Sequence, residues 1–209
     1  MERQLSRREL NKKKCRARIL RASRRLFSSK GYESTTIEDV ADRAEVSKAT
    51  LYNYFPNKES LLIGIAEEEL EQVGDLISKD LKDEKNAVEK IRQALELLIV
   101  DSIRYISLAR KITYLNSCEE SPLYATRMDM IRLFEELVME GQAQGTLRKD
   151  IKTSDIVDII MGIYLMSQFE WSHIDQYTPE FCREKLNRIL SEVLESRIAG
   201  DAEIAEERE

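Results

Sequence analysis

The chain has 209 residues, of which 34% are charged and only ten are Gly or Pro, so its length allows one or two domains and its composition favours long helices with few turns. The net charge of −6 would argue against nucleic-acid binding if it were spread evenly, but residues 1–58 carry fifteen Lys and Arg against seven Asp and Glu. This segment therefore has a charge of +8 and residues 59–209 have −14, which indicates an anion-binding module attached to an acidic body.

The first part of the chain predicts a basic arm followed by a helix. Residues 1–12 are polar and basic, and as an arm they could reach phosphates or a minor groove; a disordered tail is the alternative. Spacing predicts a helix from about Lys13 to Lys30 that ends at Gly31. Its buried side would hold Ile19, Ala22, Leu26 and Phe27, and its other sides Lys13, Lys14, Arg16, Arg18, Arg21, Arg24 and Arg25.

Two short helices with a tight connection are predicted next, between Thr35 and Pro56. Thr36 can cap the first helix with Asp39 as its capping partner, and Ser47 can cap the second. The buried side of the second helix is expected to hold Leu51 and Phe55, which leaves Lys48, Ala49, Thr50, Tyr52, Asn53 and Tyr54 on its other faces. This is the pattern of a DNA-reading helix-turn-helix, although an αα-hairpin in an ordinary helical protein has similar spacing.

A long helix is expected after Pro56, from its cap at Asn57 to about Leu81. Its middle carries four glutamates between positions 67 and 71, which indicates that it turns away from DNA. We interpret it as a rod that links two domains, so the domain boundary falls within a helix and not in a flexible linker.

Further helices are predicted in the acidic body. One covers residues 84–116 with a break near Tyr105, and Ser121-Pro122 opens another that Gly145 ends. Thr153 or Ser154 opens the most apolar helix of the chain, which extends to residue 172, and Thr178-Pro179 opens the last one. Residues 200–209 are expected to be a disordered acidic tail.

The segment from Ile19 to Leu62 carries a specific set of residues: Gly31-Tyr32, Thr35-Thr36-Ile37, Val40-Ala41, Ala44, Val46-Ser47, Thr50-Leu51-Tyr52, Tyr54-Phe55, Lys58-Glu59 and Leu61-Leu62. In these residues the chain resembles the TetR/AcrR family of bacterial transcriptional regulators. The rest of the chain resembles the family only in length and helical layout. Two positions depart from the family pattern, because Glu45 and Ala49 stand where the family usually has glycine, in the turn and facing DNA.

The resemblance implies an all-α fold in which an N-terminal three-helix helix-turn-helix domain is joined by a long helix to a C-terminal helical ligand-binding and dimerisation domain. We expect a basic arm at 1–12, the DNA-binding domain at 13–74, the ligand-binding and dimerisation domain at 75–199 and the acidic tail at 200–209. The residues expected to contact double-stranded DNA are Thr35, Thr36, Ser47, Lys48, Ala49, Thr50, Tyr52, Asn53, Tyr54 and Lys58.

The resemblance also implies a small-molecule effector and a homodimer. Aromatic and Met side chains of the C-terminal body suit a pocket for a mostly apolar effector, with plain core as the alternative; the candidates are Tyr105, Met128, Phe134, Met161, Tyr164, Gln168 and Trp171. The last two helices are apolar over a broad arc, which indicates either a dimer seam or the central helices of a monomer. The candidates for the seam are Ile159, Ile163, Met166, Leu186, Ile189, Leu190 and Val193.

Little in the sequence supports an enzyme, a metal protein or a membrane protein. Nucleophile motifs, Gly-rich phosphate loops and paired Cys-x-x-Cys ligands are absent, and His173 with Glu170 supplies at most half of a metal site. No cofactor is therefore expected. Three widely spaced cysteines, the lack of a long apolar run and the lack of a signal-peptide pattern favour a cytoplasmic protein.

Together with these observations, the family resemblance implies a ligand-responsive homodimeric repressor that binds a palindromic operator and is released by a small, mostly apolar effector. The first alternative is an architectural DNA-binding protein that responds to no effector. The second and weaker alternative is a helical metal protein or enzyme.

Overall fold

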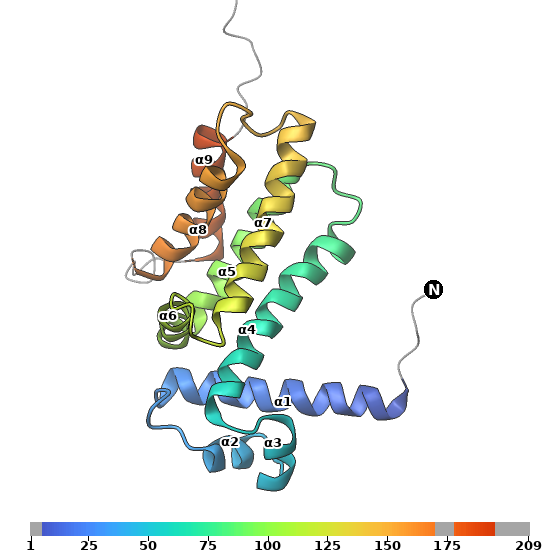
Figure 1. Ribbon diagram of the computed structural model, residues 1–209, viewed down its shortest axis with the longest axis vertical. Helices are drawn as coiled ribbons and strands as arrows, with labels where there is room; N and C mark the ends of the chain where they lie inside the picture. Colours follow the sequence, from blue (N-terminus) through green and yellow to red (C-terminus); the bar gives the residue numbers. More distant parts are fainter. Residues whose placement is uncertain (1–5, 170–177, 195–209) are drawn as a thin grey trace, which may run out of the picture. The chain divides into compact units, whose positions relative to one another are not determined.

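The computed structural model describes residues 6–169 and 178–194, and the expectations for Glu170, Trp171, His173 and the 200–209 tail lie outside these residues. The described residues form α-helices and one π-helical turn, without a strand, which confirms the all-α class (Figure 1). The elements are α1 (Arg7–Ser29), α2 (Ile37–Arg43), α3 (Lys48–Tyr54), α4 (Lys58–Asp75), the π-helical turn η1 (Leu76–Asp80), α5 (Ala87–Arg104), α6 (Ile106–Leu115), α7 (Tyr124–Gln144), α8 (Thr153–Phe169) and α9 (Pro179–Val193).

The chain divides into two compact units. The first combines Met1–Gln72 with Asp101–Met128, and the second combines Val73–Val100 with Asp129–Glu209. Helices α4, α5 and α7 each contain residues of both units. Periodicity does not predict that Asp101–Met128 belongs to the same unit as the N-terminal residues. The contacts between α1 and α6 join residues that are far apart in sequence.

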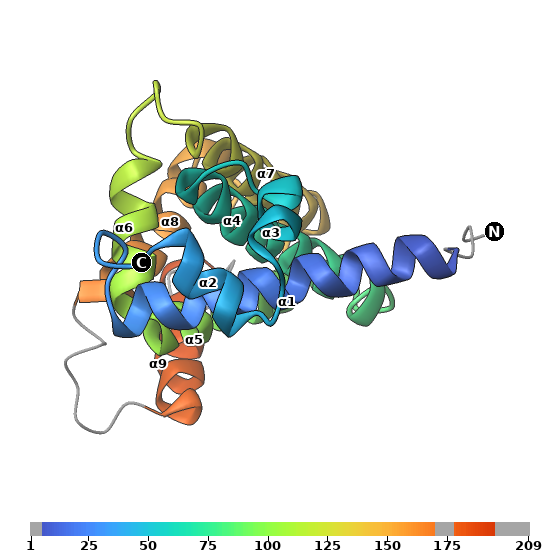
Figure 2. The same cartoon turned by 90° about the horizontal axis from the view of Figure 1, so that it is seen from below.

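The first unit is built around α1, with α2 and α3 on one side of it and α6 beside its C-terminal end (Figures 1 and 2). One hydrophobic cluster joins side chains of α1, α2, α3, α4 and α6. Glycine is required where α4 meets this cluster, because a Cβ at Gly64 would lie 2.7 Å from the ring of Phe55 and 3.1 Å from Leu20. The core therefore fixes the positions of the two short helices that carry the candidate DNA-binding residues.

Helix α1 begins at Arg7 and not near Lys13, so residues 7–12 are helical and the expected arm is shorter. A capping box explains the difference: the Glu9 amide donates to Ser6 Oγ at 3.3 Å, and the Ser6 amide donates to Glu9 Oε2 at 2.8 Å. The Ser-x-x-Glu spacing was available in the sequence, but the density of basic residues around it concealed this start signal.

Most of the other predicted helix boundaries agree with the structure. The predicted break at Tyr105 is confirmed, since this residue separates α5 from α6 with φ −126° and ψ 44°. Thr178 caps α9 through the Phe181 amide at 3.1 Å. The predicted start of α7 at Pro122 is wrong, because a turn closed by the Tyr124 amide on the Ser121 carbonyl, at 2.9 Å, precedes the helix.

The second unit contains α8, α9 and most of α5 and α7. Lys90 of α5 pairs with Glu140 of α7 at 2.8 Å, and Arg183 of α9 pairs with Glu96 of α5 at 2.7 Å. In α9 and at its C-cap the side chains that recur every four residues are buried, namely Cys182, Leu186, Leu190 and Leu194. No helix within residues 6–169 and 178–194 combines the length and apolar character needed to cross a membrane.

Candidate nucleic-acid interface

The caps of α2, α3 and α4 set the geometry of the helix-turn-helix, and all three were predicted correctly. The Asp39 amide donates to Thr36 Oγ1 at 3.1 Å, and the Thr50 amide donates to Ser47 Oγ at 3.1 Å. The Ser60 amide donates to Asn57 Oδ1 at 2.7 Å. Each cap satisfies an orphan N–H of its helix, so short helices that are unstable alone begin at fixed residues.

The turn between α2 and α3 depends on a left-handed residue. Glu45 has φ 53°, and its amide donates to the Asp42 carbonyl at 3.1 Å while the next amide, of Val46, donates to the Ala41 carbonyl at 3.0 Å. A side chain with a Cβ is strained in this conformation, which is the physical reason for the usual glycine of the TetR/AcrR pattern at this position.

We expect Glu45→Gly to raise the free energy of unfolding by about 0.5–1 kcal/mol, because relief of the left-handed strain exceeds the entropy cost of glycine. Urea unfolding at unchanged m-value measures the gain. Glu45→Ala is the matched control, since alanine keeps the Cβ and should bring no gain. A glycine variant that is no more stable than the alanine variant would show that the turn is not strained.

One side of α3 is exposed and the other is buried. Leu51 and Phe55 are 0% and 4% exposed and face the core, as predicted. The opposite side carries Lys48, Ala49, Tyr52 and Asn53, all exposed, which we call the α3 face. Thr50 is half-buried and its hydroxyl lies 2.8 Å from that of Ser47. The α3 face is therefore the surface of this helix that is available for DNA contacts.

Glu38 of α2 reaches one member of the α3 face. Its carboxylate pairs with the Lys48 ammonium at 3.0 Å, and this hydrogen bond lowers the pKa of Glu38. Because both side chains are exposed, the pair contributes little to stability. It does, however, restrict the positions that the Lys48 charge can take in front of α3.

Thr35 and Lys58 have partners within the chain. Thr35 is buried and its hydroxyl donates to the Gly31 carbonyl at 2.7 Å. The Lys58 ammonium donates to the carbonyls of Tyr32, Glu33 and Thr35 at 2.8, 3.2 and 3.3 Å, and it lies 4.4 Å from the centre of the Tyr32 ring. Both side chains therefore hold the loop that precedes α2.

Thr36 and Tyr54 occupy the edges of this surface. Thr36 is exposed at the N-terminus of α2, where backbone N–H groups favour anions. Tyr54 is half-buried, and burial together with a hydrogen bond to Cys15 raises the pKa of its hydroxyl. The Tyr54 hydroxyl therefore keeps its proton and can act as a donor at neutral pH.

Most basic residues of α1 are exposed, but Arg16 is half-buried and pairs with Glu67 at 2.8 Å, and the burial of Arg24 corrects the sequence prediction. Arg24 is only 7% exposed, and its guanidinium pairs with Asp101 and lies 3.4 Å from the Glu68 carboxylate. The prediction placed Arg24 among the solvent-facing charges, because its partners are 77 and 44 positions away. The basic residues of α1 that are exposed and supply positive potential are Arg7, Arg8, Lys12, Lys13, Lys14, Arg18, Arg21 and Arg25.

The predicted effector residues belong to both compact units, and their role in binding an effector stays a prediction. Phe134 and Gln168 are buried and Met161 and Tyr164 half-buried in the second unit, whereas Tyr105 and Met128 belong to the first. None of these six lines the cavity of about 420 Å³ that η1, α5 and α9 form in the described part of the second unit. Apolar periodicity does not indicate this cavity, because its lining mixes charged, polar and apolar side chains from three separate elements.

The predicted seam residues differ in exposure. Leu186 and Leu190 are 0% and 1% exposed and pack inside their own chain, while Ile159, Ile163 and Ile189 are half-buried. Met166 and Val193 are exposed, together with two residues that the prediction missed, Leu165 and Phe169. We call Leu165, Met166 and Phe169 the α8 apolar patch. Among the described residues no group of three or more His, Cys, Asp or Glu side chains could hold a metal ion.

Comparison with known proteins identifies the helix-turn-helix segment and relates the rest of the chain to regulators. Residues 19–65 match the family model of bacterial regulatory proteins, tetR family. The chain is 30% identical over 162 residues to the nucleoid occlusion factor SlmA of Vibrio atlanticus (strain LGP32), covering 75% of this chain and 81% of that protein. It is 26% identical over 204 residues to the HTH-type transcriptional repressor DhaR of Mycobacterium sp. (strain GP1), covering 92% and 96%.

A solved structure extends the similarity to the fold. The transcriptional regulator FadR from Bacillus subtilis, in complex with stearoyl-CoA, superposes with a TM-score of 0.69 at 20% identity. The match covers 83% of this chain and 96% of that one. Both the N-terminal helix-turn-helix and the C-terminal helices therefore have counterparts among proteins of known structure.

Proposed function

The chain belongs to the tetR family of bacterial regulatory proteins, and from this membership we propose that it is a homodimeric repressor whose palindromic operator is released when a small, mostly apolar effector binds. Membership makes it a transcriptional regulator and not an enzyme. We further propose that it acts in the cytoplasm. The observation that carries the proposal is the α3 face, an exposed polar surface on a helix that caps and core contacts hold in place.

DNA reading is assigned to the α3 face and its edges. Lys48, Tyr52 and Asn53 would read base edges or phosphates in a major groove, and Ala49 could touch a thymine methyl. Thr36, Ser47, Thr50 and Tyr54 would contribute hydroxyls to neighbouring phosphates. For Thr35 and Lys58 the contacts within the chain support a different part, in which they hold the loop that positions α2.

Repression and response to an effector are supported by relatives. DhaR is named a transcriptional repressor, and the FadR structure holds stearoyl-CoA, a ligand with a long apolar part. Phe134, Met161, Tyr164 and Gln168 remain the proposed effector contacts in the described part of the second unit. A coupling of about 1–3 kcal/mol between effector and operator would change DNA affinity some 5–150-fold.

A homodimer is supported by the α8 apolar patch and by exposed Val193, because an exposed apolar cluster of this kind marks an interaction surface. Two reading heads related by two-fold symmetry would meet major grooves about 34–36 Å apart, which requires a palindromic operator.

The second candidate function is an architectural DNA-binding protein without an effector, and the similarity to a nucleoid occlusion factor favours it. Thermal unfolding in the presence of a panel of small apolar compounds separates the two. A compound that raises the melting temperature and also releases operator DNA supports the repressor, since a ligand that binds only the native state stabilises it. A panel without such a compound, together with broad binding across the chromosome, supports the architectural protein.

We expect Asn53→Ala to relax the base preference at one position of each half-site by about 1–3 kcal/mol, because an Asn that bonds adenine through two hydrogen bonds discriminates by this amount. Selection of binding sites from random duplexes measures the change. Asn187→Ala, at an exposed position of α9, is the control and should return the wild-type consensus. An identical consensus for Asn53→Ala would remove Asn53 from the reading residues.

A further inference from the structure

The cavity of the second unit has a composition suited to a small ligand. Its volume of about 420 Å³ lies within the usual range for small-molecule sites. One wall is a stripe of half-buried side chains of α5 at positions 92, 93, 96, 97 and 100, which lie on one side of the helix. Leu76 of η1 and Pro179 and Arg183 of α9 complete the lining.

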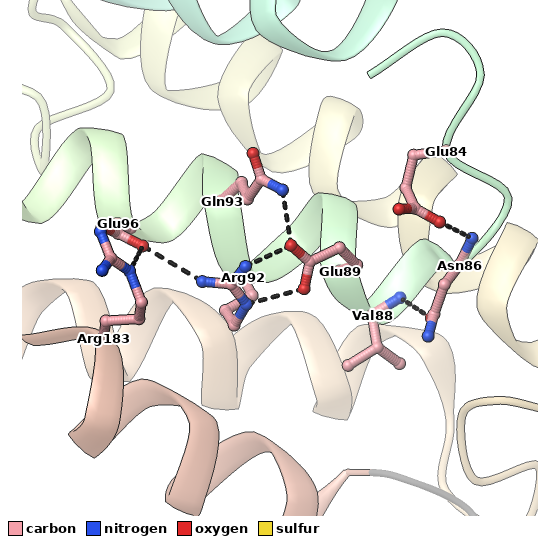
Figure 3. Close-up of polar contacts among 8 residues, drawn as sticks. All are labelled: Glu84, Asn86, Val88, Glu89, Arg92, Gln93, Glu96 and Arg183. Carbon is pink, nitrogen blue, oxygen red and sulfur yellow. Dashed lines mark hydrogen bonds and ion pairs between the residues drawn. The ribbon is translucent and has the colours of Figure 1, made fainter. Parts of the chain in front are cut away.

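One end of the stripe is charged (Figure 3). Glu96 accepts hydrogen bonds from Arg92 Nη1 at 3.1 Å and from Arg183 Nε and Nη2 at 3.2 and 2.7 Å. Arg92 also bonds Glu89, from Nε at 2.8 Å and from Nη2. Arg92 is thus held from two sides and its side chain is 16% exposed, whereas Arg183 is held by Glu96 and its side chain is 49% exposed.

The donors at this end outnumber the acceptors. Two guanidinium groups offer ten N–H donors, and the bonds to Glu89 and Glu96 use five of them within the described residues. Glu96 accepts three hydrogen bonds from the two arginines, and Glu89 accepts two from Arg92 and one from Gln93, against a capacity of about four for each carboxylate. The lining itself holds two arginines and one glutamate, and Glu89 beside Arg92 brings the net charge of this end to zero, so the free N–H donors and not the net charge favour an anion. An anionic group therefore fits this end better than an ammonium group.

The other end of the stripe is apolar. Leu97 and Val100 follow the charged residues along α5, and Leu76 and Pro179 add apolar surface from other elements. Val100 lies eight positions after Arg92, which corresponds to about 12 Å along the helix axis. The cavity therefore offers an elongated apolar wall that begins beside two arginines.

We propose that this cavity binds a small amphipathic anion, with a carboxylate or phosphate head at Arg92 and Arg183 and an apolar body along Leu97 and Val100. This proposal rests on the proposed function in one respect, which is that the ligand would be an effector. The site does not include the effector residues proposed above. The bound head competes with Glu96 for Arg183, so the ligand weakens the contact that joins α5 to α9.

Calorimetric titration of the full chain with decanoate, decyl phosphate, decanol and decylamine tests this site. Decanoate or decyl phosphate should bind at least about tenfold more tightly than decanol or decylamine, because only an anionic head gains charge-assisted hydrogen bonds. The stronger of the two anions distinguishes a carboxylate source from a phosphate source. Arg183→Gln should weaken anion binding about tenfold or more and leave decanol unchanged.

Two further variants show whether a loss of anion affinity in Arg183→Gln comes from the binding site or from a folding defect. Arg188→Gln removes an exposed arginine of α9 outside the lining and should bind as wild type. Arg183→Lys keeps the charge and should retain part of the affinity that Arg183→Gln loses. The proposal is overturned if neither anion binds, if decanol or decylamine binds as tightly as the anions, or if Arg183→Gln leaves anion affinity unchanged. DNA binding is not a readout here, so these outcomes leave the proposed operator binding untouched.

Discussion

Replacement of Arg24 by methionine should lower the free energy of unfolding by about 3–5 kcal/mol, the range found when one partner of a buried ion pair is removed. The Arg24 guanidinium bonds Asp101, donates to the Ile65 carbonyl at 3.3 Å and lies 3.4 Å from Glu68. Methionine fills a similar volume but leaves the partly buried carboxylates of Asp101 and Glu68 without the charge of Arg24. The loss would therefore come from electrostatics rather than from a cavity.

The pH dependence of this loss identifies its cause. Burial raises the pKa of Glu68 and raises that of Glu69 to about 7, while the charge of Arg24 lowers both. Without Arg24 these folded-state pKa values rise further above the unfolded values. The penalty is therefore full only above the raised pKa values of the variant, which for Glu69 is above about 7, and it shrinks as the carboxyl groups take up protons toward pH 5.

Chemical unfolding at pH 8 and pH 5 measures the effect of Arg24→Met. Arg25→Met is the matched control, because Arg25 is its exposed neighbour on α1 and should change stability by no more than about 0.5 kcal/mol. Equal effects of the two variants at both pH values would contradict the role given to the buried guanidinium.

Met166→Glu should convert the proposed homodimer to a monomer at micromolar concentration. Met166 lies in the α8 apolar patch and is 48% exposed in the single chain. If this patch is the seam, a glutamate there loses its hydration without gaining a partner, which costs several kcal/mol and more than about a hundredfold in dimer affinity.

Sedimentation equilibrium of Met166→Glu and of Met139→Glu provides the comparison. Met139 is 52% exposed on α7 and outside the α8 apolar patch, so its glutamate variant should remain dimeric. A dimeric Met166→Glu protein with wild-type operator affinity would place the seam on another surface.

Local patterns predicted the helix-turn-helix well because its signals act over a few residues. Thr36 with Asp39, Ser47 with Thr50 and the Asn57 cap each join groups three positions apart, and the structure contains all of these bonds. The turn at Glu45 is also local, and its departure from glycine marks the left-handed residue. Such features can be read from sequence without knowing what packs against them.

Features that depend on distant partners could not be predicted in this way. Arg24 looked like one of several surface charges, and only the folded chain brings Asp101 to it. Leu186 and Leu190 have the same apolar spacing whether they face their own chain or a partner, so periodicity could not tell that they are buried. Lys58 fitted a phosphate contact by position, yet its ammonium is directed to three backbone carbonyls.

Reading of DNA sequence by the α3 face is tested most directly by comparing two affinities of the 209-residue chain. One is for its own selected duplex and the other is for a scrambled duplex of the same composition. Fluorescence anisotropy at about 0.15 M salt gives both values under conditions where non-specific binding is screened. We expect a palindromic consensus that binds at least about a thousandfold more tightly than the scrambled duplex. Equal affinity for the two duplexes would contradict it and would leave a protein that binds DNA through charge alone.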